Sequence, residues 1–196
     1  MKYPTILLFG PPGAGKGTWG KLIAVMPGFS HVSSGEMFRN LNEETEIGAL
    51  CKSFAERGEF VPDDVTIQLW QEHMQQLAES GEFNVENDLV LLDGIPRNVP
   101  QAEELDDLID VKLLLFFDSE DRSVLVERLK KRALIEHRAD DANEDTIRHR
   151  MEVYDEQTHA MLQHYDADLV AKVDVSIPIP KILHQVSSAL VDRLED

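Results

Sequence analysis

The chain has 196 residues, a formal net charge of −18 at pH 7 and an apolar fraction of 42%, values that indicate one globular domain with a full hydrophobic core. No apolar stretch approaches the length of a membrane span, the N-terminus lacks the pattern of a signal peptide, and the single Cys51 excludes an intramolecular disulfide and a multi-cysteine zinc site. So large a negative charge disfavours nucleic acid and anionic membranes as partners, and the sequence predicts a cytoplasmic protein.

The apolar run at residues 5–9 predicts a buried strand, and residues 18–25 have the periodicity of a helix. Between them lies GPPGAGKGT, residues 10–18, whose glycines allow backbone N–H groups to turn inward around an anion. A strand, a glycine-rich loop, a lysine and a helix form the P-loop arrangement, in which Lys16 can follow the β- and γ-phosphates of a nucleotide. A plain turn with a surface lysine is the alternative, and the spacing disfavours it.

Further strands and helices alternate along the chain. Strands are expected at residues 5–10, 29–33, 89–93, 111–118 and 169–175. Helices are expected at residues 45–58, 62–80, 122–132, 144–165 and 180–194. This alternation predicts an α/β fold, a doubly wound parallel five-stranded sheet of the P-loop NTPase type with helices on both faces. Ligands of such sheets bind at the C-terminal ends of the strands, so the residues that follow each strand are the candidate site.

Several short motifs lie at or after these strand ends: SSGEMFR (33–39), GEFVPDD (58–64), DGIPRNVPQAE (93–103), ERLKKRALIEHRADD (127–141) and RHRMEVY (148–154). With GPPGAGKGT they resemble the nucleoside monophosphate kinases, and the adenylate kinase family most closely, over nearly the whole chain. The resemblance implies reversible, Mg²⁺-dependent phosphoryl transfer, ATP + AMP = 2 ADP, by a monomer whose partners are small-molecule nucleotides. Such chemistry needs positioned positive charge and exclusion of water, and it needs no general base because the acceptor phosphate is already ionised.

The resemblance also implies roles for individual residues. The expected catalytic residues are Lys16, Arg97, Arg132, Arg138 and Arg150. The expected ATP-binding residues are Gly13, Ala14, Gly15, Lys16, Gly17, Thr18 and Arg128. The expected AMP-binding residues are Ser34, Arg39, Val61, Gly94, Arg97 and Gln101. A surface ion pair is the alternative for any arginine, and it is the preferred interpretation for Arg57, Arg122, Arg148 and Arg193. An extra residue between Asp141 and Arg150 leaves open whether Arg148 or Arg150 is catalytic, although the four-residue spacing to Tyr154 favours Arg150.

Two acidic features belong to the expected site. Asp93 ends the run LVLLD, as a Walker B acid does, and is expected to hold Mg²⁺ through water, with a turn-capping role as the alternative. Thr18 is a weak second candidate ligand because its hydroxyl stands one position later than is usual. The Asp140–Asp141 pair either orients Arg132 and Arg138 or caps the helix that opens near Asn143.

Two further features concern the acceptor and the lid. The amide of Gln101 can meet the adenine edge with both a donor and an acceptor, whereas a surface position for Gln101 is the alternative. UMP/CMP kinase is the nearest rival function; a P-loop kinase of a small metabolite and a nucleotide-gated binding module are more distant rivals.

The segment ALIEH between Arg132 and Arg138 indicates a short lid without a zinc site, and all seven histidines are interpreted as surface or core residues. A single kinase domain is therefore expected, with a core (1–32, 65–132 and 141–196), a helical acceptor-binding segment (33–64) and a short lid (133–140).

Overall fold

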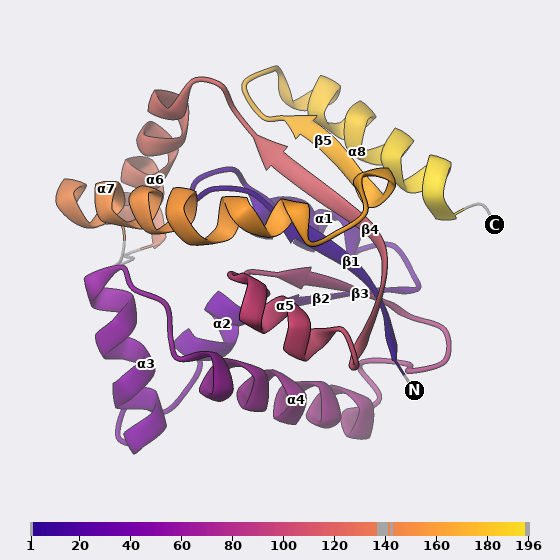
Figure 1. Ribbon diagram of the computed structural model, residues 1–196, viewed down its shortest axis with the longest axis horizontal. Helices are drawn as coiled ribbons and strands as arrows, with labels where there is room; N and C mark the ends of the chain where they lie inside the picture. The colour runs from indigo at the N-terminus through magenta and orange to yellow at the C-terminus, as the bar shows by residue number, and fades with distance from the viewer. Residues whose placement is uncertain (1, 137–140, 142, 195–196) are drawn as a thin grey trace.

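The computed structural model describes residues 2–136, 141 and 143–194, and its sheet has five parallel strands in the order β2-β3-β1-β4-β5 (Figure 1). The strands are β1 (Tyr3–Phe9), β2 (Phe29–Ser33), β3 (Leu89–Asp93), β4 (Ile109–Asp118) and β5 (Val170–Asp174). After β1 the chain forms the edge strand β2 and then β3, which lies between β2 and β1; β4 and β5 follow on the other side of β1. The predicted doubly wound parallel sheet is therefore confirmed.

Helices cover both faces of this sheet. They are α1 (Lys16–Ile23), α2 (Ser34–Arg39), α3 (Glu46–Arg57), α4 (Asp63–Ser80), α5 (Val99–Leu105), α6 (Arg122–Glu136), α7 (Glu144–Val153) and α8 (Ile179–Leu194). Short irregular helices are η2 (Tyr154–Thr158), η3 (His159–Gln163) and η4 (Ala167–Leu169). One core cluster packs α4, α5 and η3 against one face of the sheet, and the other packs α1, α6 and α8 against the opposite face. In Figure 1, the arrowheads of β4 and β5 point towards the side of the molecule where α3 and α7 lie, so these helices stand at the C-terminal edge of the sheet.

Alternating side chains on β1 explain the two cores. Leu7 and Phe9 belong to the cluster with Trp70 of α4, whereas Ile6 and Leu8 belong to the cluster with α1, α6 and α8. A central parallel strand is buried on both faces, which is why the run shows no polar alternation. None of the described helices is both long enough and apolar enough to cross a membrane.

The ends of α3 agree with the range predicted from the sequence, whereas those of α6 and α7 differ from it. Helix α3 begins after Thr45, whose hydroxyl accepts a hydrogen bond from the Gly48 N–H at 3.0 Å, and ends at Gly58 with φ +73°. The prediction of one helix over residues 144–165 is wrong: α7 ends at Val153 and a π-helical turn follows. The residues after Tyr154 are the polar run DEQT, which offers no apolar stripe to hold a regular helix on the core. Helix α6 is longer than predicted and continues to Glu136, although Leu134 and Ile135 are exposed.

Candidate active site

The glycine-rich loop after β1 is shaped by close backbone contacts. Gly10 has φ +140°, and a Cβ at this position would lie 2.0 Å from the carbonyl oxygen of Phe117 in β4. Gly15 has φ +88° and directly precedes α1, whose first residue is Lys16. The loop therefore turns tightly against the sheet and presents the N-terminus of α1, an arrangement that binds anions.

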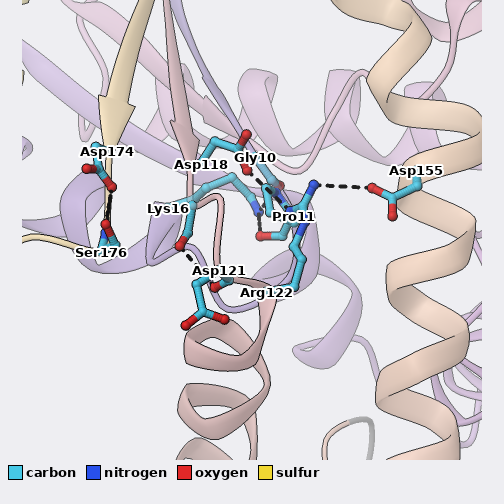
Figure 2. A network of polar contacts seen from close by, with 10 residues as sticks. Gly10, Pro11, Lys16, Asp118, Asp121, Arg122, Asp155, Asp174 and Ser176 are labelled. Carbon is cyan, nitrogen blue, oxygen red and sulfur yellow. Dashed lines mark hydrogen bonds and ion pairs between the residues drawn. The ribbon is translucent and has the colours of Figure 1, made fainter.

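The Lys16 amine is buried inside this loop. Its Nζ donates to the carbonyl oxygens of Gly10 at 2.6 Å and Pro11 at 3.1 Å, as Figure 2 shows. Burial lowers the pKa of Lys16 to about 8. The Asp93 carboxylate opposes this shift, and three nearby arginines add to it, namely Arg97, Arg132 and Arg150. The loop and its surroundings thus concentrate positive charge at one place in a strongly acidic protein.

A cavity of about 770 Å³ opens beside Lys16 at the C-terminal ends of the strands. Twelve of the sequence-predicted site residues line it: Gly13, Gly15, Lys16, Gly17, Thr18, Arg39, Val61, Asp93, Gly94, Arg97, Arg132 and Arg150. They come from the P-loop, from the segment around α2 and α3, from the loop after β3, and from α6 and α7. The fold thereby brings segments that are distant in sequence to one cavity.

Four predicted residues do not line this cavity. Ala14 is buried, and Ser34 and Gln101 are completely buried. Arg128 donates from Nη2 to the carbonyl oxygen of Val175 at 2.7 Å. The surface alternative for Gln101 is therefore wrong. Arg138 and Asp140, also predicted, lie outside the described residues.

Arg97 is held in the cavity wall by several contacts. Its Nε donates to the Gly94 carbonyl oxygen at 2.5 Å, and its Nη2 lies 3.3 Å from Ser34 Oγ. The guanidinium also lies over the ring of Phe60, 4.6 Å from the ring centroid. The Phe60 contact has no signal in the sequence, because the two residues belong to segments far apart in the chain.

Asp141 joins the two arginines on the opposite side. Its Oδ2 accepts from Nε and Nη2 of Arg132, both at 2.6 Å, and its Oδ1 accepts from Arg150 Nη1. The Asp141 side chain is completely buried. The helix-capping role, the alternative considered for Asp141, belongs to Asn143, whose side chain accepts a hydrogen bond from the Asp145 N–H at the start of α7. The expected pairing of Asp141 with Arg132 is confirmed, and the contact with Arg150 was not expected from the sequence; Arg138, the other expected partner, lies outside the described residues.

The two candidate catalytic arginines of α7 have different surroundings. Arg150 is half-buried and lines the cavity, whereas Arg148 is exposed and is absent from the lining. Two other arginines form the expected ion pairs. Arg57 pairs with Glu59 at 2.8 Å, and Arg122 lies 3.3 Å from both Asp118 and Asp155, between which it stands in Figure 2.

Oxygen atoms suited to a hard cation also reach the cavity. Asp93 ends β3 with its carboxylate nearly buried, and Thr18 lies in the first turn of α1. A carboxylate and a hydroxyl fit Mg²⁺, which binds through one or two carboxylates, waters and substrate phosphates. The Nε2 of His31, whose side chain is 6% exposed, lies 3.7 Å from Asp93 Oδ2, a proximity that the sequence did not reveal. Within residues 2–136, 141 and 143–194, no group of three or more His, Cys, Asp or Glu side chains is arranged to hold a metal ion.

Comparison with known proteins agrees with this geometry. The sequence model of a family described as "Adenylate kinase" matches residues 8–170. A protein named adenylate kinase from Thermobifida fusca is 38% identical over 197 residues, covering 96% of this chain and 98% of the relative. Proteins of the same name from Kocuria rhizophila and Corynebacterium aurimucosum are 39% and 41% identical, covering 94% and 90% of this chain and 97% and 93% of the relatives.

Proposed function

Because this chain belongs to the adenylate kinase family, we propose that the cavity beside Lys16 is where it transfers a phosphoryl group from ATP to AMP. The protein is a nucleoside monophosphate kinase and catalyses ATP + AMP = 2 ADP. The observation that carries the placement is the gathering of Lys16, Arg97, Arg132 and Arg150 around one cavity. Phosphoryl transfer spreads negative charge over the transferred oxygens, and such a set of fixed cations stabilises that charge.

The donor is assigned to the P-loop side. Backbone N–H groups from Gly13 to Thr18 surround the β-phosphate, and the Lys16 amine exchanges its contacts with Gly10 and Pro11 for phosphate oxygens. Arg128 lies beside the donor base. Its hydrogen bond to the Val175 carbonyl oxygen holds the guanidinium in place. Arg132, Arg138 and Arg150 cover the triphosphate.

The acceptor is assigned to the opposite end. Arg39 and Arg97 hold the AMP phosphate with planar, bidentate guanidinium groups. The base lies against Val61, Gly94 and Ser34, where Gln101 distinguishes adenine from other bases. Equal use of UMP or CMP would instead place the chain with the pyrimidine kinases.

A divalent cation completes the proposed site. Asp93, through water, and Thr18 more weakly would hold Mg²⁺ together with the ATP phosphates. When bound, Mg²⁺ neutralises charge on the phosphate oxygens. The chain's own contribution is to place Asp93 beside Lys16 and to surround both with arginines.

Two segments are proposed to close over the substrates and exclude water, the acceptor-binding segment 33–64 and the lid 133–140. Gly58, at the end of α3, already lies against α7, since a Cβ there would be 2.8 Å from Arg150 Cγ. Closure brings Arg150 between the two nucleotides and prevents phosphoryl transfer to water. A monomeric state and a cytoplasmic location remain predictions.

A coupled assay tests the assignment. With MgATP saturating, AMP should exceed UMP and CMP in kcat/KM by at least about tenfold, since an unpaired buried polar group typically costs about 1–3 kcal/mol. Gln101→Ala should reduce this preference by weakening AMP, with the KM for ATP little changed. An unchanged preference in Gln101→Ala would remove Gln101 from the base site.

A further inference from the structure

The Gln101 side chain belongs to a closed set of hydrogen bonds that also includes Asp63, Asn98 and the backbone of Arg97. Gln101 Oε1 accepts from the Arg97 N–H at 2.8 Å, and Gln101 Nε2 donates to Asp63 Oδ1 at 2.6 Å. Asn98 Nδ2 donates to both oxygens of Asp63, at 3.0 and 3.1 Å, and Asn98 Oδ1 accepts from the Gln101 N–H at 2.9 Å. Each side chain therefore has a partner at both of its ends.

The partners determine which way each amide faces. A backbone N–H can only donate, so the Arg97 N–H requires the oxygen of Gln101, and the Gln101 N–H requires the oxygen of Asn98. Both amide NH₂ groups are thereby directed at Asp63, whose ionised carboxylate can only accept. Asp63 opens α4, where the helix dipole favours a negative charge.

This arrangement limits what Gln101 can offer to a ligand. Its carbonyl oxygen is engaged by Arg97, and one of its two amide hydrogens by Asp63. The second amide hydrogen enters no hydrogen bond among the described residues. Gln101 is completely buried behind the cavity wall, where it contacts Arg97, which lines the cavity, and Asp63, two positions after the cavity-lining Val61. A ligand that reaches Gln101 would therefore find one amide hydrogen, a donor without an accompanying acceptor.

We propose that Asp63 is a positioning residue for base selection, which fixes the Gln101 amide so that the acceptor base must present a ring nitrogen that accepts a hydrogen bond. The inference rests on the proposed function, in which the base of the monophosphate meets Gln101. Adenine satisfies the requirement because its N1 carries no hydrogen. Hypoxanthine fails it because its N1 carries a hydrogen, and two donors then face each other in a buried site. Asp63 itself does not contact the base.

Three monophosphates vary the ring nitrogen and the group at C6. AMP has an accepting N1 and an amino group at C6, purine riboside 5′-monophosphate keeps the accepting N1 with only hydrogen at C6, and IMP has an N–H at N1 and a carbonyl oxygen at C6. The unmodified protein should use purine riboside 5′-monophosphate at least about tenfold better than IMP in kcat/KM, the loss expected for one unpaired buried donor. Comparable use of the two analogues would overturn the inference while leaving AMP kinase activity, and so the proposed function, intact.

Asp63→Asn is the decisive variant because it keeps the shape of the side chain and leaves too few acceptors for both neighbouring amides. The Gln101 amide can then turn, and the ratio of purine riboside 5′-monophosphate to IMP should fall about tenfold towards one, through the KM of the acceptor and not that of ATP. Asp64→Asn removes the same charge from the same turn of α4 at an exposed position, and it should leave the ratio unchanged.

The outcomes distinguish positioning from a structural role. If Asp63→Asn lowers kcat/KM for all three acceptors equally, Asp63 acts only on stability and the inference is wrong; an unchanged ratio has the same meaning. Asp63→Ser, which leaves a small hydroxyl to Asn98, replaces Asp63→Asn if the latter melts below the assay temperature. Absence of AMP-dependent ADP formation by the unmodified protein would instead reject the proposed function.

Discussion

Asp141 Oδ2 lies 2.6 Å from both Nε and Nη2 of Arg132, in a side-on pairing that leaves the carboxylate's other oxygen for Arg150. One buried carboxylate thereby holds two cavity-lining guanidinium groups that would otherwise repel each other. The side chains of Arg132 and Arg150 remain 28% and 19% exposed, so both can be reached from the cavity that they line.

Asp141→Asn should therefore impair both stability and turnover. Removing one partner of a buried ion pair typically costs about 3–5 kcal/mol, and a loss at the lower end is expected because the arginines are partly solvated. Turnover should fall at least about tenfold, because two misplaced cations weaken transition-state stabilisation. Thermal unfolding and kcat measure the two effects. Asp145→Asn, an exposed change in the first turn of α7, is the control, and similar behaviour of the two variants would contradict the role given to Asp141.

The sequence was most informative where a pattern is local. Residues 89–93 form β3 as predicted, because a five-residue apolar run that ends at a turn is typical of a buried strand. The ends of α3 were also predicted, since Thr45 and Gly58 are a hydrogen-bonding N-cap and a left-handed C-cap. The P-loop was recognisable because its glycines and lysine are contiguous.

The contacts that orient the site were less predictable, because they join residues without any local signal. Gln101 and Asp63 are 38 residues apart, and Phe60 reaches Arg97 from another segment. Both pairs require the start of α4 and the loop before it to lie against α5 and the loop after β3, which only the tertiary structure provides. The change from α- to π-helix after Val153 was missed for the opposite reason, since residues compatible with an α-helix continue through the polar run that follows Tyr154.

Lys16→Met should abolish most activity without unfolding the protein. The amine is the one lysine nitrogen placed in the P-loop, so turnover should fall by about two orders of magnitude or more. Its folded-state pKa of about 8 lies below the ordinary 10.5, so charged Lys16 destabilises the unliganded fold below pH 8, and the penalty is relieved as pH rises towards 10.5. The melting temperature of Lys16→Met relative to the unmodified protein should therefore be highest near pH 7 and decrease from pH 8 to 10. A difference that is independent of pH would contradict the burial argument.

Magnesium removal should suppress turnover reversibly. Excess EDTA should abolish ADP formation from ATP and AMP, and added Mg²⁺ should restore it, because the proposed ligands Asp93 and Thr18 act only together with the phosphates. A zinc-selective chelator should change neither turnover nor the melting temperature. A shift of several degrees with that chelator would reveal a structural metal site.

Salt should affect stability and acceptor binding in opposite directions. A formal charge of −18 implies repulsion across the surface, which ions screen, so the melting temperature should rise by a few degrees from low to moderate NaCl. The same screening weakens attraction of AMP to Arg39 and Arg97, so its KM should rise. Chloride salts are required, because sulfate would compete for the phosphate cavity. A falling melting temperature would refute the repulsion argument.

Phe60→Leu tests how much the aromatic ring contributes to the proposed role of Arg97 in binding the acceptor phosphate. The ring centroid lies 4.6 Å from the guanidinium carbon, within the range of a cation–π interaction, which at a half-buried site is worth about 1 kcal/mol. Loss of the ring should raise the KM for AMP about fivefold and leave the KM for ATP unchanged, whereas Phe60→Tyr, which keeps the ring face, should behave nearly as the unmodified protein.

Phe54→Leu is the matched control, because the Phe54 ring lies 4.7 Å from Arg57 outside the cavity. If Phe60→Leu and Phe54→Leu raise the KM for AMP equally, the effect belongs to general packing of the acceptor-binding segment. If only Phe60→Leu does so, and Phe60→Tyr does not, the aromatic face is what keeps Arg97 aimed at the phosphate.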